Sequence, residues 1–490
     1  MSPQTSISEY LVKLKKRFLV AERTIALQFE KPPGFTFRPG QWIDITLLNP
    51  SETDEEGDTR GFSIASAPHE DFLMVVTRLR DTAYKRQLPD LPLDTVVKLE
   101  GPGGELRLQN RTEHAAVFLA GGIGITPVRS ILLHAAHENL QHQIFVFYSN
   151  RRPEDTAFLE ELTDLQRENP NFTVIPTMTG MAKSTQSWNG ETARMNEALL
   201  AKYLTEVQSP IYYVVGPPDM VSGVHETLNK AGVDDDDIRT EEFEGYGAAK
   251  TPKYLVKLKK RFFVAERTMA FQFERPPGFS FRPGQWIDLT LLNPSETDAE
   301  GNTRRFSVAS APDDDSLMVV TRVRDTAFKR QLSHLPLNTE VKLEGPGGAM
   351  RLHNRTEHAA VFLVGGIGIT PVHSILLQVA HDTLAHHIFV FFSNRRPEDA
   401  AFLDELTELQ QKIPNFTLIP TMTGMAKSTQ SWDGETARLD ETLLRKYLAD
   451  AKSPIYYLVG PSKMVNAVHE MLNKAGIDDD DIRRDEFEGY

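Results

Sequence analysis

Residues 115–127 read AAVFLAGGIGITP, and residues 359–371 read AAVFLVGGIGITP. In both copies a continuous apolar run passes into a glycine-rich turn that ends in Thr and Pro. This order predicts a buried β-strand, a tight turn and the start of a helix. Glycines in such a turn let backbone N–H groups approach a diphosphate at the positive end of the helix. A tight turn without any ligand would have the same sequence, and for the motif taken alone that alternative stays open.

The phosphate-binding interpretation selects four positions in each copy. Thr126 would cap the helix with its side chain, and Pro127 suits the first helical turn. The residues expected to seat a dinucleotide are Gly122, Gly124, Thr126 and Pro127, and then Gly366, Gly368, Thr370 and Pro371.

The two copies belong to a repeat that covers nearly the whole chain. The stretch from Tyr10 to Tyr246 returns from Tyr254 to Tyr490 without a gap, always 244 positions later. Such a repeat is too long for a solenoid unit, and each half can bury a core of its own. The sequence therefore predicts two whole modules in tandem.

Within a module, the sequence pattern changes near Arg111. From Tyr10 to about Asn110, short alternating runs such as Trp42–Leu47 are separated by Pro, Gly and Asp, which predicts an antiparallel barrel or sandwich. Beyond Arg111, apolar strands alternate with helical patterns, which predicts a parallel α/β domain. The expected helices are Pro127–His137, Asp155–Gln166, Asn196–Thr205 and Met220–Ala231, the last ending at Gly232. The expected domains are 8–111, 112–246, 254–355 and 356–490, with a linker at 247–253.

Composition narrows the class of protein. The 490 residues carry a net charge of -14, which argues against nucleic acid as the main partner. No apolar run approaches the roughly 18 residues of a membrane helix, and the first residues lack a signal-peptide core, so we expect a cytoplasmic protein with no membrane span. The absence of cysteine excludes disulfides and Cys-ligated clusters, so redox chemistry would need an organic cofactor or a partner's metal.

Two further features bear on assembly and on metals. The seven-residue linker spans about 15 Å if flexible, less than the roughly 18 Å radius of gyration of a module, so the modules are expected to pack against each other. His134 and His137 have helical spacing, but Gln378 replaces the first of them in the second module. We therefore expect no metal site.

A second motif lies in the antiparallel half, at Arg60-Gly-Phe-Ser63 and Arg304-Arg-Phe-Ser307. An arginine can hold a phosphate in a fork, and a serine hydroxyl can bond a ring nitrogen. Taken alone, each of these residues is as typical of an ordinary protein surface as of a binding site. Further donors follow downstream at Thr77, Arg78 and Lys85, and at Thr321, Arg322 and Lys329.

Taken together and in this order, the motifs resemble those of the ferredoxin-NADP reductase superfamily. Arg60–Ser63 is similar to the Arg-x-Tyr-Ser flavin motif of that family, and Gly122–Pro127 is similar to its Gly-x-Gly-x-x-Pro nucleotide motif. Val215-Gly216-Pro217 falls where the family commonly has Cys-Gly near the nicotinamide. Glu244-Gly-Tyr246 resembles the Glu-x-Tyr ending of plant-type members, in which the aromatic ring covers the flavin.

The resemblance implies a flavin, FAD or else FMN, in the antiparallel domain and NADPH or NADH on the α/β domain, with hydride passing from nicotinamide C4 to flavin N5. Arg60 would hold the flavin phosphate, and Phe62 and Ser63 would contact the ring. The residues expected to act in catalysis are Ser63, Glu244, Tyr246, Ser307, Glu488 and Tyr490. Those expected at the cofactors also include Gly216, Pro217, Arg304, Phe306, Gly460 and Pro461.

Three departures from the family pattern affect cofactor binding. Phe62 and Phe306 lack the usual Tyr hydroxyl, which removes a hydrogen bond worth about 1 kcal/mol. Lys85 and Lys329 replace the Ser of a phosphate turn, which makes FAD versus FMN an open choice. Val215 and Val459 replace the Cys.

The choice between NADP and NAD depends on few charges. The loop at 177–184 lies where plant-type members bind the 2'-phosphate, and only Lys183 is charged there. Arg151 and Arg152 could contribute, although two solvated arginines are an equal alternative. The sequence slightly favours NADPH.

The function that these features predict is a tandem NAD(P)H-dependent flavoprotein reductase that passes electrons to ferredoxin, flavodoxin or another soluble acceptor. One alternative is a reductase of free flavin or an oxygenase partner, which the altered flavin motifs would permit. Another is a nucleotide-binding scaffold with one inactive module, suggested by the missing Cys and by the Gly61 and Arg305 difference.

Overall fold

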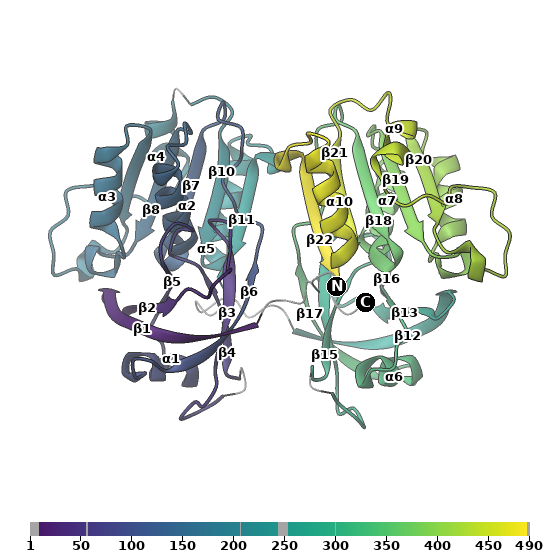
Figure 1. Ribbon diagram of the computed structural model, residues 1–490, viewed down its shortest axis with the longest axis horizontal. Coiled ribbons are helices and arrows are strands. Elements are labelled where there is room, and N and C mark those ends of the chain that lie inside the picture. The colour runs from purple at the N-terminus through teal and green to yellow at the C-terminus, as the bar shows by residue number, and fades with distance from the viewer. Residues whose placement is uncertain (1–8, 55–56, 206, 244–252, 299, 488–490) are drawn as a thin grey trace. The chain divides into compact units, whose positions relative to one another are not determined.

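The chain divides into two compact units, residues 1–249 and 250–490, each containing one copy of the repeat. The computed structural model describes residues 9–54, 57–205, 207–243, 253–298 and 300–487 (Figure 1). We call the first unit module one and the second unit module two.

Module one contains an antiparallel and a parallel sheet, and the chain passes from the last strand of the first sheet to the first strand of the second without an intervening helix. Its strands are β1 (Glu9–Ala21), β2 (Thr24–Glu30), β3 (Trp42–Leu47), β4 (Thr59–Ser63), β5 (Phe72–Arg78), β6 (Val96–Gly103), β7 (Ala116–Gly121), β8 (Ile144–Asn150), β9 (Phe172–Met178), β10 (Ile211–Gly216) and β11 (Ile238–Glu242). Its helices are α1 (Ala83–Gln87), α2 (Ile125–His137), α3 (Leu159–Glu168), α4 (Glu197–Leu204) and α5 (Pro218–Lys230), with 3-10 turns η1 (Leu88–Asp90), η2 (Gly122–Gly124), η3 (Pro153–Asp155), η4 (Met181–Lys183) and η5 (Asp235–Asp237).

Module two repeats this order. Its strands are β12 (Lys253–Ala265), β13 (Thr268–Glu274), β14 (Trp286–Leu291), β15 (Thr303–Ser307), β16 (Ser316–Arg322), β17 (Glu340–Gly347), β18 (Ala360–Gly365), β19 (Ile388–Asn394), β20 (Phe416–Met422), β21 (Ile455–Pro461) and β22 (Ile482–Phe487). Its helices are α6 (Ala327–His334), α7 (Ile369–Asp382), α8 (Leu403–Lys412), α9 (Glu441–Tyr447) and α10 (Ser462–Lys474), with 3-10 turns η6 (Gly366–Gly368), η7 (Pro397–Asp399), η8 (Met425–Lys427) and η9 (Asp479–Asp481).

The antiparallel sheet of module one closes into a barrel, which confirms the predicted fold class. Its strand order is β4-β3-β6-β1-β2-β5, and an antiparallel bridge between Ile64 and Val75 joins the two ends. Alternation along β1 explains the core, because Val12 and Leu14 are buried while Lys13 and Lys15 face outward. Module two has the equivalent order, β15-β14-β17-β12-β13-β16.

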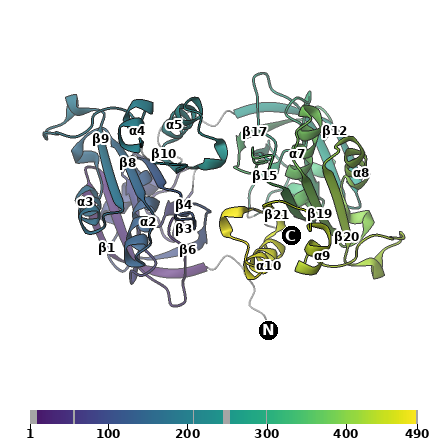
Figure 2. The same ribbon diagram turned by 90° about the horizontal axis from the view of Figure 1, so that it is seen from above.

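The parallel sheet has the order β11-β10-β7-β8-β9. Every residue of β7 is buried, because helices cover both faces of the sheet. Helices α2 and α3 pack on the face that carries Phe118, and α4 and α5 on the face that carries Val117 (Figure 2). The predicted parallel α/β domain is thus confirmed.

Three predicted helix starts are wrong. The helix expected from Met220 begins two residues earlier, at Pro218. The helix expected from Asp155 begins at Leu159, because Pro153 opens a separate 3-10 turn and Phe158 takes a left-handed φ of 61°. The helix expected from Pro127 begins at Ile125, directly after the 3-10 turn at Gly122–Gly124. Gly232, with φ +82°, follows the end of α5 as predicted.

The described residues contain neither a membrane-spanning helix nor a metal-binding cluster. None of the helices in those ranges is long and apolar enough to cross a membrane. Nor do three His, Asp or Glu side chains in those ranges gather into a group that could hold a metal ion.

Candidate functional site

The glycine-rich turn lies at the carboxyl end of β7, where open α/β sheets bind their ligands. Gly122 takes φ +56°, and a Cβ there would meet open space. At Gly124 a Cβ would overlap the carbonyl oxygen of Val215, so only glycine allows the turn to pack against β10. The turn therefore has one glycine facing space for a ligand and another that fixes the backbone.

The prediction that Thr126 caps α2 is wrong. Gly124 precedes the helix as its N-cap, and no side chain caps the helix start. Thr126 lies inside the first turn, where its hydroxyl donates to the Ile123 carbonyl at 3.0 Å. Thr370 donates to Ile367 at 2.7 Å in the same way. The N–H of Ile125, the first residue of α2, already donates to the Gly122 carbonyl within the preceding 3-10 turn.

The end of β10 meets this turn from the neighbouring strand. Gly216 takes φ +158°, and a Cβ there would lie 3.3 Å from the Cα of Gly121. Pro217 follows as the N-cap residue of α5, which directs the chain away from the turn. The equivalent residues of module two are Gly460, with φ +150°, and Pro461.

Ser63 meets a carboxylate across the seam between the barrel and the α/β domain. Its Oγ donates to Glu241 Oε1 at 3.2 Å, and the two residues are 178 positions apart. Burial raises the pKa of the Glu241 carboxyl to about 7, and the hydrogen bond from Ser63 opposes this shift. The pair therefore offers a hydroxyl and a proton-exchanging carboxyl beside the edge of the barrel.

Module two has a modified version of this pair. Asp485 replaces Glu241, and within the described ranges Ser307 makes no hydrogen bond to it. Burial and then the charge of Glu486 raise the pKa of Asp485 to about 6, while Arg305 lowers it. Arg305 lies over the ring of Trp286 and pairs with Asp288 at 3.0 Å, whereas module one has Gly61 at the equivalent position.

We expect the free energy of unfolding of module one to depend on Glu241. Because its folded pKa of about 7 exceeds its ordinary 4.5, the folded state binds the extra proton between these values. The protonated Glu241 carboxyl stabilises the folded state fully below pH 4.5. This contribution to the free energy of unfolding falls by about 2 kcal/mol as the pH rises to 7, after allowance for the partial exposure of the side chain. Urea unfolding of Glu241→Gln should lack this slope. D485N should remove only the pH dependence that Asp485 contributes to module two, which ends near pH 6. If the free energy of unfolding of E241Q depends on pH as in the parent protein, the titration does not belong to Glu241.

Four predicted catalytic residues lie outside the described residues, namely Glu244, Tyr246, Glu488 and Tyr490. The structure instead brings Glu241 to Ser63, three residues earlier. The stretch Glu241-Glu242-Phe243 also has the Glu-x-aromatic order, and the N–H of Phe243 donates to the Gly216 carbonyl at 3.0 Å. The Glu-x-aromatic spacing at 241–243 could have pointed to Glu241, but the sequence prediction chose the same spacing at 244–246.

Basic side chains gather on the barrel near the predicted phosphate site. Burial and then the charges of Arg324 and Arg304 lower the pKa of Lys329, which places three cations close together. The equivalent residues of module one are Arg60, Arg80 and Lys85. The donor set of the cluster suits a flavin phosphate, and sequence reasoning missed Arg80 and Arg324.

Other predicted residues of the barrel belong to its core or to the seam. Phe62 is buried beside Tyr84, and its counterpart Phe306 is buried beside Phe328. Thr77 and Thr321 are also buried. Arg78 pairs with Asp155 at 2.9 Å and Arg322 with Asp399 at 2.6 Å, so both arginines join the barrel to the α/β domain rather than the basic cluster.

A buried arginine that the sequence did not single out completes the seam. Arg129 on α2 donates to the Ala65 carbonyl at 2.6 Å and to both carboxylate oxygens of Glu161. Next to it, Ser130 donates to the Ser66 carbonyl at 2.6 Å. These contacts hold the helix that follows the glycine turn against the strand segment that follows Ser63.

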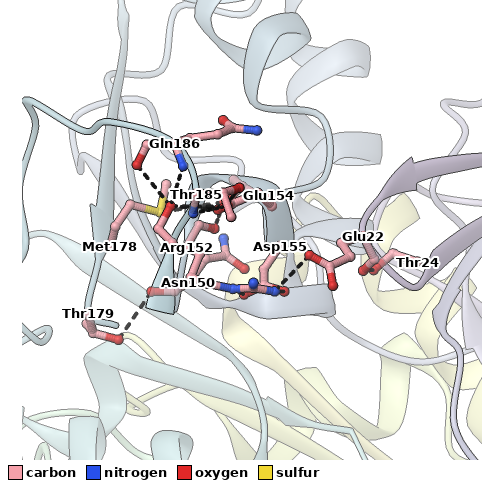
Figure 3. Close-up of polar contacts among 12 residues, drawn as sticks. Glu22, Thr24, Asn150, Arg152, Glu154, Asp155, Met178, Thr179, Thr185 and Gln186 are labelled. Atoms are coloured by element: carbon pink, nitrogen blue, oxygen red, sulfur yellow. Dashed lines mark hydrogen bonds and ion pairs between the residues drawn. The ribbon is translucent and has the colours of Figure 1, made fainter. Parts of the chain in front are cut away.

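The segment beyond β8 carries Arg152, one of the residues considered for NADP selection, and Figure 3 shows its surroundings. Arg152 pairs with Asp155 and with Glu22, each at 3.0 Å. Although burial opposes the shift, hydrogen bonds from the backbone, Thr185 and Ser184 lower the pKa of Glu154 to about 2. This end of the sheet therefore holds a carboxylate that is ionised at neutral pH and an arginine that is already paired.

An unpaired donor lies at the same end of the sheet. Asn150 is buried at the end of β8, and its Nδ2 has no hydrogen-bond partner among the described residues. The equivalent Nδ2 of Asn394 is also unpaired within those ranges. A buried amide N–H group that lacks a partner in these ranges, at the carboxyl end of a parallel strand, suits a polar ligand such as a nucleotide.

Comparisons with known proteins identify the α/β domains. The family model for the oxidoreductase NAD-binding domain matches residues 118–226 and 362–470. The chain is 28% identical over 216 residues to the glycine betaine monooxygenase reductase subunit of Chromohalobacter salexigens, a match that covers 43% of this chain and 57% of that protein. It is also 28% identical over 225 residues to the phenol hydroxylase P5 protein of Acinetobacter pittii, covering 45% and 60%.

The chain thus spans somewhat more than half the length of these relatives. Among solved structures, it is similar to the FAD/NAD-binding domain of nitric oxide dioxygenase from Vibrio cholerae. That match has a TM-score of 0.41 and 20% identity, and it covers 48% of this chain and 98% of the other.

Proposed function

We propose that the chain belongs to the ferredoxin-NADP reductase superfamily and that each module is an NAD(P)H-dependent flavoprotein reductase, which passes electrons to a separate acceptor. The observation that carries the proposal is the contact between Ser63 and Glu241 at 3.2 Å. This contact places a hydroxyl and a titratable carboxyl at the seam between the two domains. The barrel on one side carries the basic cluster, and the α/β domain on the other carries the glycine-rich turn.

The chain's own residues would position the reactants. Backbone N–H groups of the turn at Gly122–Gly124 would bind the nucleotide diphosphate. Arg60, with Arg80 and Lys85, would bind the flavin phosphate. A bound flavin would supply the hydride acceptor and the ability to release electrons singly. Ser63 would orient the ring, and Glu241 would exchange a proton at Ser63 Oγ.

The acceptor is the finer part of the proposal. By their names, one of the relatives given above is the reductase subunit of a monooxygenase, and the other is a protein of phenol hydroxylase. This likeness supports an oxygenase component or another soluble redox protein, such as ferredoxin or flavodoxin, as the acceptor. A second candidate function, reduction of free flavin, is favoured by the ion pair that holds Arg60 through its own loop.

A steady-state assay tests the proposal. The protein is mixed with NADH or NADPH, with FAD, FMN or no flavin, and with ferricyanide as a one-electron acceptor. We expect nicotinamide oxidation that depends on flavin. Exposed Arg151 and Lys183 support NADPH, whereas ionised Glu154 opposes its 2'-phosphate, so the ratio of kcat/KM for the two nucleotides decides between them. No oxidation with either nucleotide and either flavin would contradict the proposal.

A further inference from the structure

An acidic loop precedes the flavin motif in each module and folds onto the predicted phosphate-binding arginine. We define the acidic loop as residues 51–54 in module one and 295–298 in module two. In module one, Asp54 accepts a hydrogen bond from Arg60 at 3.2 Å and another from the backbone N–H of Ala83 at 2.9 Å. One carboxylate thus binds the arginine and the start of α1 together.

Other contacts hold the acidic loop in this position. Glu52 accepts from Arg86 Nε at 2.9 Å, and the N–H of Ser51 donates to the side chain of Gln87 at 2.6 Å. Both partners lie on α1. The loop is therefore anchored on the helix beside the basic cluster at several points.

Module two repeats the arrangement. Asp298 accepts from Arg304 at 2.8 Å, and Glu300 pairs with the same guanidinium at 2.9 Å. The hydrogen bond from Arg304 lowers the pKa of Asp298, so the carboxylate stays ionised at neutral pH. Glu296 pairs with Arg330 at 2.7 Å, as Glu52 does with Arg86.

The arginine itself is turned into its own loop. Arg60 Nη1 donates to the carbonyls of Gly57 and Thr59, both at 2.8 Å, while Nη2 binds Asp54. Only 15% of the Arg60 side chain is exposed. Arg304 likewise donates to the carbonyls of Gly301 and Thr303. A phosphate can therefore gain the forked contact only if the carboxylate yields it.

We propose that Asp54 and Asp298 set the affinity and the selectivity of the two flavin sites, because each carboxylate competes with the flavin phosphate for its arginine. The inference rests on the proposed function. A phosphate that approaches the arginine meets an ionised carboxylate of the same sign at close range, which is unfavourable. Riboflavin has no phosphate and does not meet this repulsion. The loop therefore favours weakly held, exchangeable flavin.

The test compares flavin affinities in the full chain without nicotinamide nucleotide. The double variant Asp54→Asn, Asp298→Asn keeps an oxygen that can accept from Ala83 N–H and removes the aspartate charge from each arginine. In module two, Glu300 still pairs with Arg304 at 2.9 Å. Binding of FAD, FMN and riboflavin is measured by flavin fluorescence. In module one we expect FAD and FMN to bind about tenfold more tightly than to the parent protein, because one like-charge contact is removed. The gain in module two should be smaller, because Glu300 still pairs with Arg304. Riboflavin should bind to the variant and to the parent protein with the same affinity.

A matched control uses the same loop. The double variant E52Q, E296Q weakens the contacts to Arg86 and Arg330 and leaves the pairs at Arg60 and Arg304, so flavin affinities should not change. Unchanged or weaker FMN binding in the Asp54→Asn, Asp298→Asn variant would overturn the inference, since the carboxylates would then only position the arginines. An equal gain for riboflavin would also overturn it.

A third double variant separates this inference from the proposed function. R60A with R304A should weaken FAD and FMN binding at least tenfold while leaving riboflavin unchanged. If it does so and the Asp variant gives no gain, the flavin site stands and the competition is wrong. If flavin affinities do not respond to the arginines at all, both the inference and the predicted phosphate site are wrong.

Discussion

Replacing Gly124 with alanine is expected to weaken nicotinamide nucleotide binding in module one by about 100-fold. The added Cβ would overlap the backbone carbonyl of Val215, which cannot move aside as a flexible side chain could. The turn must therefore shift away from β10, and a displacement of about 1 Å at a positioning element costs on the order of 100-fold. Isothermal titration with NADH and NADPH measures the loss.

The repeat provides the comparison for this variant. G368A should cause the same loss in module two, because its Cβ would overlap the Val459 carbonyl. The double variant should retain no measurable binding at either site. G223A is the matched control, since a Cβ on this helical glycine meets nothing within 4 Å. Equal affinities in G124A and G223A would remove the glycine turn from the nucleotide site.

Arg129→Ala is expected to lower the free energy of unfolding of module one by about 2 kcal/mol, because it leaves the Ala65 carbonyl without this donor at the seam and removes the charged contact to the partly exposed Glu161. The guanidinium is 6% exposed and binds Glu161 and the Ala65 carbonyl. Its loss would leave a carboxylate and a carbonyl without their partner at the seam. Urea unfolding at neutral pH measures the change.

Module two supplies the control for this prediction. There, buried His373 replaces the arginine, contacts the Ala309 carbonyl at 2.8 Å and pairs with Glu405 at 3.2 Å. R129H should therefore retain most of the stability, with a loss of about 1 kcal/mol. If R129H is as unstable as Arg129→Ala, the carbonyl and carboxylate contacts do not account for the role of the arginine.

Much of the fold could be predicted because its signals are local. The strand Trp42–Leu47 was predicted from alternation and has those bounds in the structure. The buried strand and the glycine turn before α2 followed from an apolar run and its glycines. Local signals failed where a neighbouring turn decides the geometry, as at Leu159, where a left-handed Phe158 delays the helix.

The candidate site was less predictable because tertiary contacts create it. Ser63 was predicted, but its partner Glu241 comes from a strand at the far end of the module, and no local pattern links them. Arg129 looks like an ordinary helical residue until the fold brings the Ala65 carbonyl to it. Arg60 was selected as a phosphate ligand, yet its ion pair with Asp54 depends on how the preceding loop folds.

We expect one chain to contain two complete hydride-transfer sites. An anaerobic titration of the flavin-loaded protein with the preferred nicotinamide nucleotide, followed by the bleaching of flavin absorbance, tests it most directly. The account predicts two flavins reduced per chain, each consuming one nucleotide. Bound flavin that neither nucleotide reduces would contradict the account, and a single reducible flavin would limit it to one module.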